Sequence, residues 1–164
     1  MLEGAGFIIF YLNKETNEPL KTVLANNYKG NATFPKGKIE KSDGSILEAA
    51  YRELKEESSI MPFQIKTIDE YVTEHDDDGM PQVRYYIGYT YDMLPLEYEN
   101  PDELAAIQWV NISNITREGM RLMDLKFKKE IRYDVFNQAF EIMKRSNRER
   151  KRSFVSPSIS MACT

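Results

Sequence analysis

Residues 34–60 read FPKGKIEKSDGSILEAAYRELKEESSI, and this segment decides how the chain is interpreted. Three carboxylates, Glu53, Glu56 and Glu57, stand at positions i, i+3 and i+4 of a helical pattern. On an α-helix this spacing puts all three on one face. Like charges so close together repel one another, and clustered carboxylate oxygens suit Mg²⁺ or Mn²⁺. The segment therefore predicts a helix that carries a divalent metal site.

A short basic stretch, Pro35-Lys36-Gly37-Lys38, precedes this helix and is suited to bind phosphate. A carboxylate-bound metal beside a phosphate-binding loop indicates metal-assisted phosphoanhydride chemistry. The alternative for the run from Glu53 to Glu57 is a solvated helix face, because Glu and Lys are common helix formers. The basic loop and the surrounding strand pattern favour the metal site.

The segment resembles the signature of the Nudix hydrolases, in which a glycine and a glutamate precede Arg-Glu-aliphatic-x-Glu-Glu-x-Gly-aliphatic. Gly37 matches the first glycine, and the second half is matched by Arg52, Glu53, Leu54, Glu56, Glu57 and Ile60. Two departures are visible before the helix end. The spacing from Gly37 to Arg52 is one residue longer than in the signature, and the position of the early glutamate falls near Asp43 or Gly44, so no glutamate occupies it. The late glycine is Ser59, which costs about 1 kcal/mol if that position is left-handed. The departures therefore affect local stability more than chemistry.

The resemblance implies an α/β protein with the Nudix-type α/β/α sandwich, in which a mixed β-sheet lies between helices. It also implies Mg²⁺ or Mn²⁺ as cofactor, with Glu53, Glu56, Glu57 and the carbonyl of Gly37 as metal ligands. We expect Arg52 to orient these carboxylates, because its guanidinium can hold a carboxylate with two hydrogen bonds.

A carboxylate outside the helix often serves as base or extra ligand in this family. Our candidate is Glu103, six residues before Trp109, because diadenosine-tetraphosphate hydrolases carry a similar glutamate before a tryptophan. Glu97 and Glu99 compete with it, and a plain surface-loop carboxylate is the alternative for Glu103.

Three residues are predicted to contact substrate. Lys36 and Lys38 can meet phosphate charge, with loop solvation as the alternative. Tyr86 matches in position a base-stacking tyrosine of the same hydrolases, with cross-strand aromatic packing as the alternative.

The predicted activity is hydrolysis of a phosphoanhydride bond in a nucleoside diphosphate-linked substrate. The loop from Phe34 to Lys38 resembles that of diadenosine-tetraphosphate hydrolases and also that of mRNA decapping enzymes. The start of the chain from Gly4 to Phe10 and the spacing from Glu103 to Trp109 favour a dinucleoside polyphosphate. Capped mRNA and diphosphoinositol phosphates are the alternative substrates, and a catalytically silent Nudix domain used for binding is the alternative class.

The periodicity around the motif predicts the remaining elements. A helix should run through about Ser58, with Ser42, Asp43 or Ser45 as its N-cap. A later helix over residues 130–144 should bury Ile131, Val135, Phe136, Ala139, Phe140 and Met143. Strands are predicted over residues 6–12, 20–26, 65–74, 81–91 and 104–110, with a short extended piece at 33–35.

Length and composition narrow the class further. The chain has 164 residues, enough for one domain, and its net charge of −4 gives no global attraction to nucleic acid. Cys163 is the only cysteine, which excludes an intrachain disulfide and fits a reducing compartment. No apolar run approaches a membrane span and no signal-peptide pattern is present, so we expect a cytoplasmic or nuclear protein.

The C-terminal segment differs in composition from the rest. Six Lys or Arg residues fall between Lys144 and Arg152, and a serine-rich end follows. We expect a Nudix domain over residues 1–145 and a disordered tail over 146–164. The basic cluster is a possible RNA contact, and a solvated helix end is the alternative.

Overall fold

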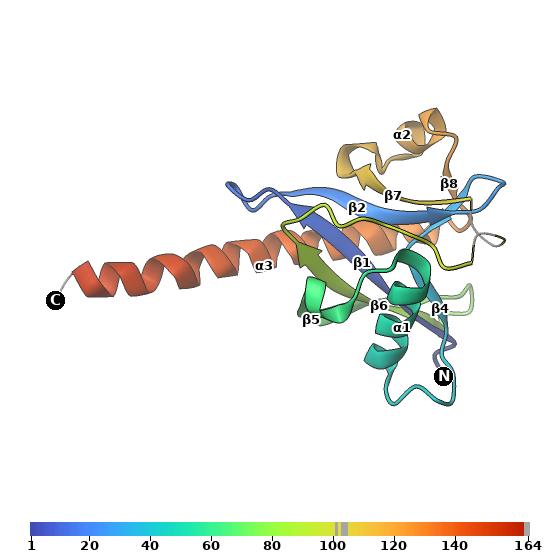
Figure 1. Ribbon diagram of the computed structural model, residues 1–164, viewed down its shortest axis with the longest axis horizontal. Coiled ribbons are helices and arrows are strands. Elements are labelled where there is room, and N and C mark those ends of the chain that lie inside the picture. The colour runs from blue at the N-terminus through green and yellow to red at the C-terminus, as the bar shows by residue number, and fades with distance from the viewer. Residues whose placement is uncertain (101, 103–104, 163–164) are drawn as a thin grey trace.

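The computed structural model describes residues 1–100, 102 and 105–162, with only the helical backbone described for 151–162. One β-sheet lies between helices that cover its two faces (Figure 1). The elements, in chain order, are β1 Gly4–Leu12, β2 Pro19–Asn26, β3 Asn31–Thr33, β4 Lys36–Lys38, α1 Ile46–Ser58, the 3₁₀ helix Pro62–Gln64, β5 Lys66–His75, β6 Pro81–Thr90, β7 Ala106–Asn111, the 3₁₀ helix Ile112–Asn114, α2 Arg117–Leu122, β8 Lys126–Phe127 and α3 Ile131–Ala162.

The eight strands form a single mixed sheet, as predicted. Its main path is β5-β6-β1-β2-β3-β8, with β4 paired to β1 and β7 paired to β2. Strand β1 runs antiparallel to β2 and β4 and parallel to β6. Because β1 is covered on both faces, its sequence is almost continuously apolar rather than alternating.

Successive residues of β1 point to opposite faces and build two cores. Phe7 and Ile9 pack in the core that includes Leu54 of α1. Ile8 and Phe10 pack in the core that includes Phe136 of α3. This arrangement confirms the α/β/α sandwich.

Helix α1 begins and ends as the sequence predicts. The backbone N–H of Glu48 donates to Ser45 Oγ at 3.1 Å, so Ser45 is the N-cap among the three candidates. Ser59 ends the helix in the left-handed conformation, with φ of 65°, where the family signature has glycine. Its hydroxyl donates to the carbonyl of Glu97 at 2.8 Å, which ties a distant loop to the end of α1.

Strand β4 is the main difference from the predicted elements, because Lys36–Lys38 were expected to form a loop. This segment instead pairs with Gly4–Gly6 at the start of β1. The close approach requires a glycine at position 6, where a Cβ atom would lie 2.3 Å from the carbonyl oxygen of Pro35. The predicted phosphate-binding residues are therefore held on the sheet.

Helix α3 continues to Ala162, well past the predicted end at residue 144. Its buried residues include Val135, Phe136, Ala139 and Met143, as predicted, whereas Ile131 is 38% exposed and was wrongly assigned to the buried stripe. The helical backbone also covers residues 146–162 of the segment for which we expected disorder. The boundary between domain and tail at residues 145 and 146 stays a prediction.

Within the described part of the chain, the structure has no helix with the length and apolar character needed to cross a membrane.

Candidate active site

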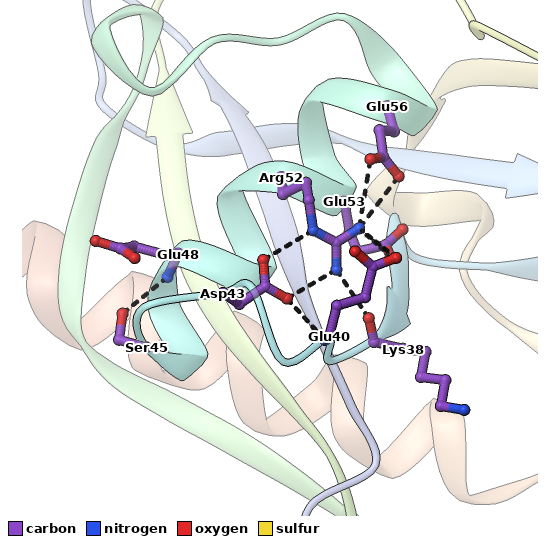
Figure 2. Close-up of polar contacts among 8 residues, drawn as sticks. All are labelled: Lys38, Glu40, Asp43, Ser45, Glu48, Arg52, Glu53 and Glu56. Carbon is purple, nitrogen blue, oxygen red and sulfur yellow. Dashed lines mark hydrogen bonds and ion pairs between the residues drawn. The ribbon is translucent and has the colours of Figure 1, made fainter.

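Arg52 of α1 lies at the centre of a group of carboxylates (Figure 2). Its Nη1 donates to Glu53 Oε1 at 2.9 Å and to both carboxylate oxygens of Glu56 at 3.3 Å. Glu40 lies slightly farther away, with 3.8 Å between its Oε1 and Nη1. One guanidinium therefore fixes the two predicted ligands Glu53 and Glu56, which agrees with the positioning role expected for Arg52.

The other side of the guanidinium holds Asp43, a residue whose role was not predicted from the sequence. Nε and Nη2 of Arg52 each donate to one Asp43 oxygen at 2.9 Å, and Nη2 also donates to the carbonyl of Lys38 at 2.8 Å. The hydrogen bonds from Arg52 lower the pKa of Asp43 to about 2. Asp43 thus ties the loop before α1 to the helix, near the position where the signature has glutamate. Its spacing from Gly37 along the sequence was the signal that could have identified this role.

Glu53 and Glu57 are one helical turn apart, and both lie against β4. A Cβ atom on Gly37 would come within 2.3 Å of both carboxylate oxygens of Glu53, so a side chain at this position would displace the carboxylate from its present place. The backbone N–H of Lys36 donates to Glu57 Oε2 at 3.1 Å. Burial raises the pKa of Glu53, and burial raises the pKa of Glu57 to about 8. Two carboxylates that are costly to ionise therefore face consecutive residues of one strand.

The three predicted ligands do not share one position. Glu53 and Glu56 both accept hydrogen bonds from Arg52, but the side chain of Glu56 is 46% exposed, whereas that of Glu53 is only 11% exposed. Among the described residues, no three Asp, Glu, His or Cys side chains form a group that could hold a metal ion. Two carboxylates still suit Mg²⁺, which keeps several waters and needs only one or two protein carboxylates. The carboxylates of Glu53 and Glu57 beside β4 therefore fit a small divalent cation.

The motif and fold agree with a comparison against known families. The family model of the NUDIX domain matches residues 4–132. The chain belongs to the Nudix family. Membership supports a hydrolase of phosphorus-containing acid anhydrides that acts on nucleoside diphosphate derivatives, and Nudix enzymes generally use divalent metals such as Mg²⁺ or Mn²⁺.

Solved structures share the Nudix fold at low sequence identity. A C. elegans Ap4A hydrolase binary complex has a TM-score of 0.55 and 19% identity, over 75% of this chain and 95% of that one. The NUDIX domain of Shewanella oneidensis NrtR, complexed with ADP ribose, has a TM-score of 0.59 and 14% identity, over 88% and 87%. The M. smegmatis Nudix hydrolase RenU has a TM-score of 0.56 and 16% identity, over 74% and 80%. No curated protein matches the chain.

The candidates for a base beside the Nudix helix α1 are only partly described. Glu103 lies outside the described residues, so its role stays a prediction. The competing candidates for the base, Glu97 and Glu99, lie beside the C-terminal end of α1. The backbone N–H of Glu97 donates to the carbonyl of Ser58 at 3.1 Å, and that of Glu99 donates to the carbonyl of Glu56 at 3.2 Å.

The predicted substrate contacts of this Nudix domain lie in different places. Lys36 and Lys38 flank Gly37 on β4, and burial lowers the pKa of Lys36. Tyr86 lies on the α1 side of the sheet, where its ring centroid is 5.9 Å from that of Phe7 and 5.8 Å from that of Tyr71. These ring contacts are the cross-strand packing named as its alternative role.

Proposed function

We propose that the protein is a metal-dependent pyrophosphohydrolase whose substrate is a dinucleoside polyphosphate. One observation carries the proposal: the carboxylates of Glu53 and Glu57 lie against Lys36 and Gly37 of β4, so cation-binding oxygens adjoin a basic strand. This is the juxtaposition that phosphoanhydride hydrolysis needs, because the leaving phosphate carries charge that must be neutralised.

Glu53, Glu57 and the carbonyl of Gly37 would hold Mg²⁺ or Mn²⁺. When bound, the cation polarises a phosphoryl oxygen and lowers the pKa of water. The chain itself supplies orientation: Arg52 holds Glu53 and Glu56, and Asp43 holds Arg52. We assign removal of the water proton to a loop carboxylate, with Glu103 as first candidate.

The choice of substrate rests on resemblance and on supporting comparisons. The Phe34 to Lys38 segment resembles that of diadenosine-tetraphosphate hydrolases, and the C. elegans Ap4A hydrolase shares the fold over 95% of its length. ADP ribose, the ligand of the NrtR domain, is a nucleoside diphosphate derivative of the same class. Capped mRNA is the second candidate, because the same segment resembles decapping enzymes and α3 carries the basic residues after Lys144.

A hydrolysis panel tests this choice. The purified protein is incubated with Mg²⁺ or Mn²⁺ and, separately, with diadenosine tetraphosphate, ADP-ribose, capped RNA or a diphosphoinositol phosphate, and the products are separated by ion-exchange chromatography. We expect the highest kcat/KM on diadenosine tetraphosphate. A higher value on capped RNA would replace the proposed substrate, and no hydrolysis of any compound would refute the proposed activity.

A further inference from the structure

A cavity of about 660 Å³ adjoins the proposed reaction site. Lys36, Gly37 and Lys38 of β4 line one part of it, and Lys129 and Arg132 at the start of α3 line another. Its size lies in the range of small-molecule sites. Strand β4 borders both places: Gly37 lies against Glu53, and Lys36 lies within electrostatic reach of Glu57 on one side and of Glu74 and Arg132 on the other.

The cavity contains a buried carboxylate whose partners are cations. Glu74, at the end of β5, is 1% exposed, and Arg132 is 6% exposed. Arg132 Nε donates to Glu74 Oε1 at 3.2 Å, and Lys129 Nζ lies 3.7 Å from Glu74 Oε2. Lys36 also lies within electrostatic reach of both Glu74 and Arg132. The cluster therefore has more positive than negative charge, in a chain whose net charge is −4.

This surplus of positive charge could bind an anionic ligand. A Glu74–Arg132 pair alone would be neutral and could be explained as a buried structural ion pair. The cavity lining also includes Lys36 and Lys129, however, and the 3.7 Å from Lys129 Nζ to Glu74 Oε2 is beyond hydrogen-bond distance, so the Lys129 ammonium is not committed to Glu74. The side chain of Lys129 is 52% exposed, so its ammonium can turn toward an acceptor in the cavity.

We propose that this cavity binds the phosphate groups of the substrate that lie beyond the cleaved anhydride. Lys36, Lys129 and Arg132 contact these phosphates, since ammonium and guanidinium groups form strong charge-assisted hydrogen bonds to phosphate oxygens. Glu74 is a positioning residue that holds Arg132 in place. The inference rests on the proposed function and deepens it, because a long phosphate chain is then preferred over a diphosphate link.

Substrate kinetics test the proposal with Lys129→Gln and the matched control Lys128→Gln. Lys128 is exposed, adjacent in sequence and absent from the cavity lining. Loss of one charge-assisted contact should raise KM for diadenosine tetraphosphate about tenfold in Lys129→Gln with little change in kcat. The rise for ADP-ribose should be at most about twofold, because its two phosphates sit at the cleavage site. Equal KM values for both variants on diadenosine tetraphosphate would overturn the proposal.

A binding measurement separates this proposal from the proposed activity. Calorimetric titration with inorganic tripolyphosphate in EDTA, repeated at two salt concentrations, should show salt-sensitive binding that Lys129→Gln weakens about tenfold and Lys128→Gln leaves unchanged. That result supports the cavity even if no substrate of the panel is hydrolysed. No binding, or equal affinity in both variants, overturns it. Circular dichroism shows that each variant is folded.

Discussion

Two charged clusters next to β4 have opposite compositions. In the first, one guanidinium, Arg52, contacts four carboxylates: Glu40, Asp43, Glu53 and Glu56. In the second, one carboxylate, Glu74, contacts the cations Lys129 and Arg132. The first cluster has a surplus of negative charge and suits a divalent cation, whereas the second has a surplus of positive charge and suits phosphate. Arg52 holds Asp43, Glu53 and Glu56 through charge-assisted hydrogen bonds, and Glu74 holds Arg132 in the same way.

The largest effect is expected when Glu57, the charged neighbour of Glu53 at the edge of the first cluster, loses its charge beside β4. Glu57→Gln keeps the shape of the side chain but removes ligand charge, so turnover should fall by at least about two orders of magnitude. The variant should remain folded, because it relieves repulsion between Glu57 and Glu53. Steady-state kinetics with Mg²⁺ measure the effect, with Glu15→Gln in the exposed β1–β2 turn as control. Parent-like turnover in Glu57→Gln would remove it from the proposed metal ligands.

A second substitution changes the geometry of the same cluster without changing its charge. In Gly37→Ala the new methyl group would lie where the carboxylate oxygens of Glu53 now are, within 2.3 Å. Displacement of a catalytic group by about 1 Å can cost about a hundredfold, so we expect turnover to fall by about ten- to a hundredfold. The pre-steady-state rate of product formation measures this loss. Unchanged turnover would show that the contact between Gly37 and Glu53 has no part in catalysis.

The hydrogen bonds that hold Arg52 should be visible as a pH effect on stability. Asp43 has a pKa of about 2 in the folded state, below its ordinary value of 3.8, so folding favours its ionised form. Its contribution is therefore complete above about pH 4 and is lost as the pH falls toward about 2. Asp43→Asn should lower Tm most above pH 4, and its Tm should approach that of the parent near pH 2.

The control for this prediction is Asp69→Asn, on an exposed position of β5. It removes the same charge away from Arg52 and should lower Tm little at any pH. A difference between Asp43→Asn and the parent that does not change with pH would contradict the role assigned to Asp43.

The smallest effect is expected from the basic end of α3. The ring of Tyr89 lies 4.4 Å from the guanidinium carbon of Arg150, and Asn147 is only 7% exposed, so a deletion should begin after residue 150. Deletion of 151–164 should leave hydrolysis of diadenosine tetraphosphate unchanged, and binding of RNA to the full chain should be weak. Fluorescence anisotropy across salt concentrations measures that binding. Tight, salt-sensitive RNA binding that weakens with the loss of Lys151 and Arg152 would favour capped RNA as substrate.

The sequence predicted most of the helices and strands that a local sequence pattern determines. Apolar periodicity located α1 and the strands β1, β2, β5, β6 and β7, because these elements are long enough to show a period. The motif also predicted the left-handed end of α1 at Ser59. Strand β4 was missed because it has only three residues, and it exists through pairing with Gly4–Gly6 far away in sequence.

The candidate site shows the same division between local and long-range features. Glu53 and Glu57 were predicted to share a face, and both lie against β4. Glu56 precedes Glu57 directly, so the two point about 100° apart around the helix, and Glu56 instead faces Arg52. The Glu74–Arg132 pair could not be predicted, because 58 residues separate its members and neither belongs to a motif.

The most direct test of the two-cluster account is the rate of diadenosine tetraphosphate hydrolysis as a function of Mg²⁺ concentration, measured for the parent, Glu57→Gln and Lys129→Gln. We expect no hydrolysis in EDTA and saturable activation of the parent by Mg²⁺. Turnover of Glu57→Gln should stay low at every Mg²⁺ concentration. Lys129→Gln should be activated by Mg²⁺ like the parent and should differ only in a higher KM for the substrate. Hydrolysis in EDTA, or the same response to Mg²⁺ in the parent and Glu57→Gln, would contradict the account.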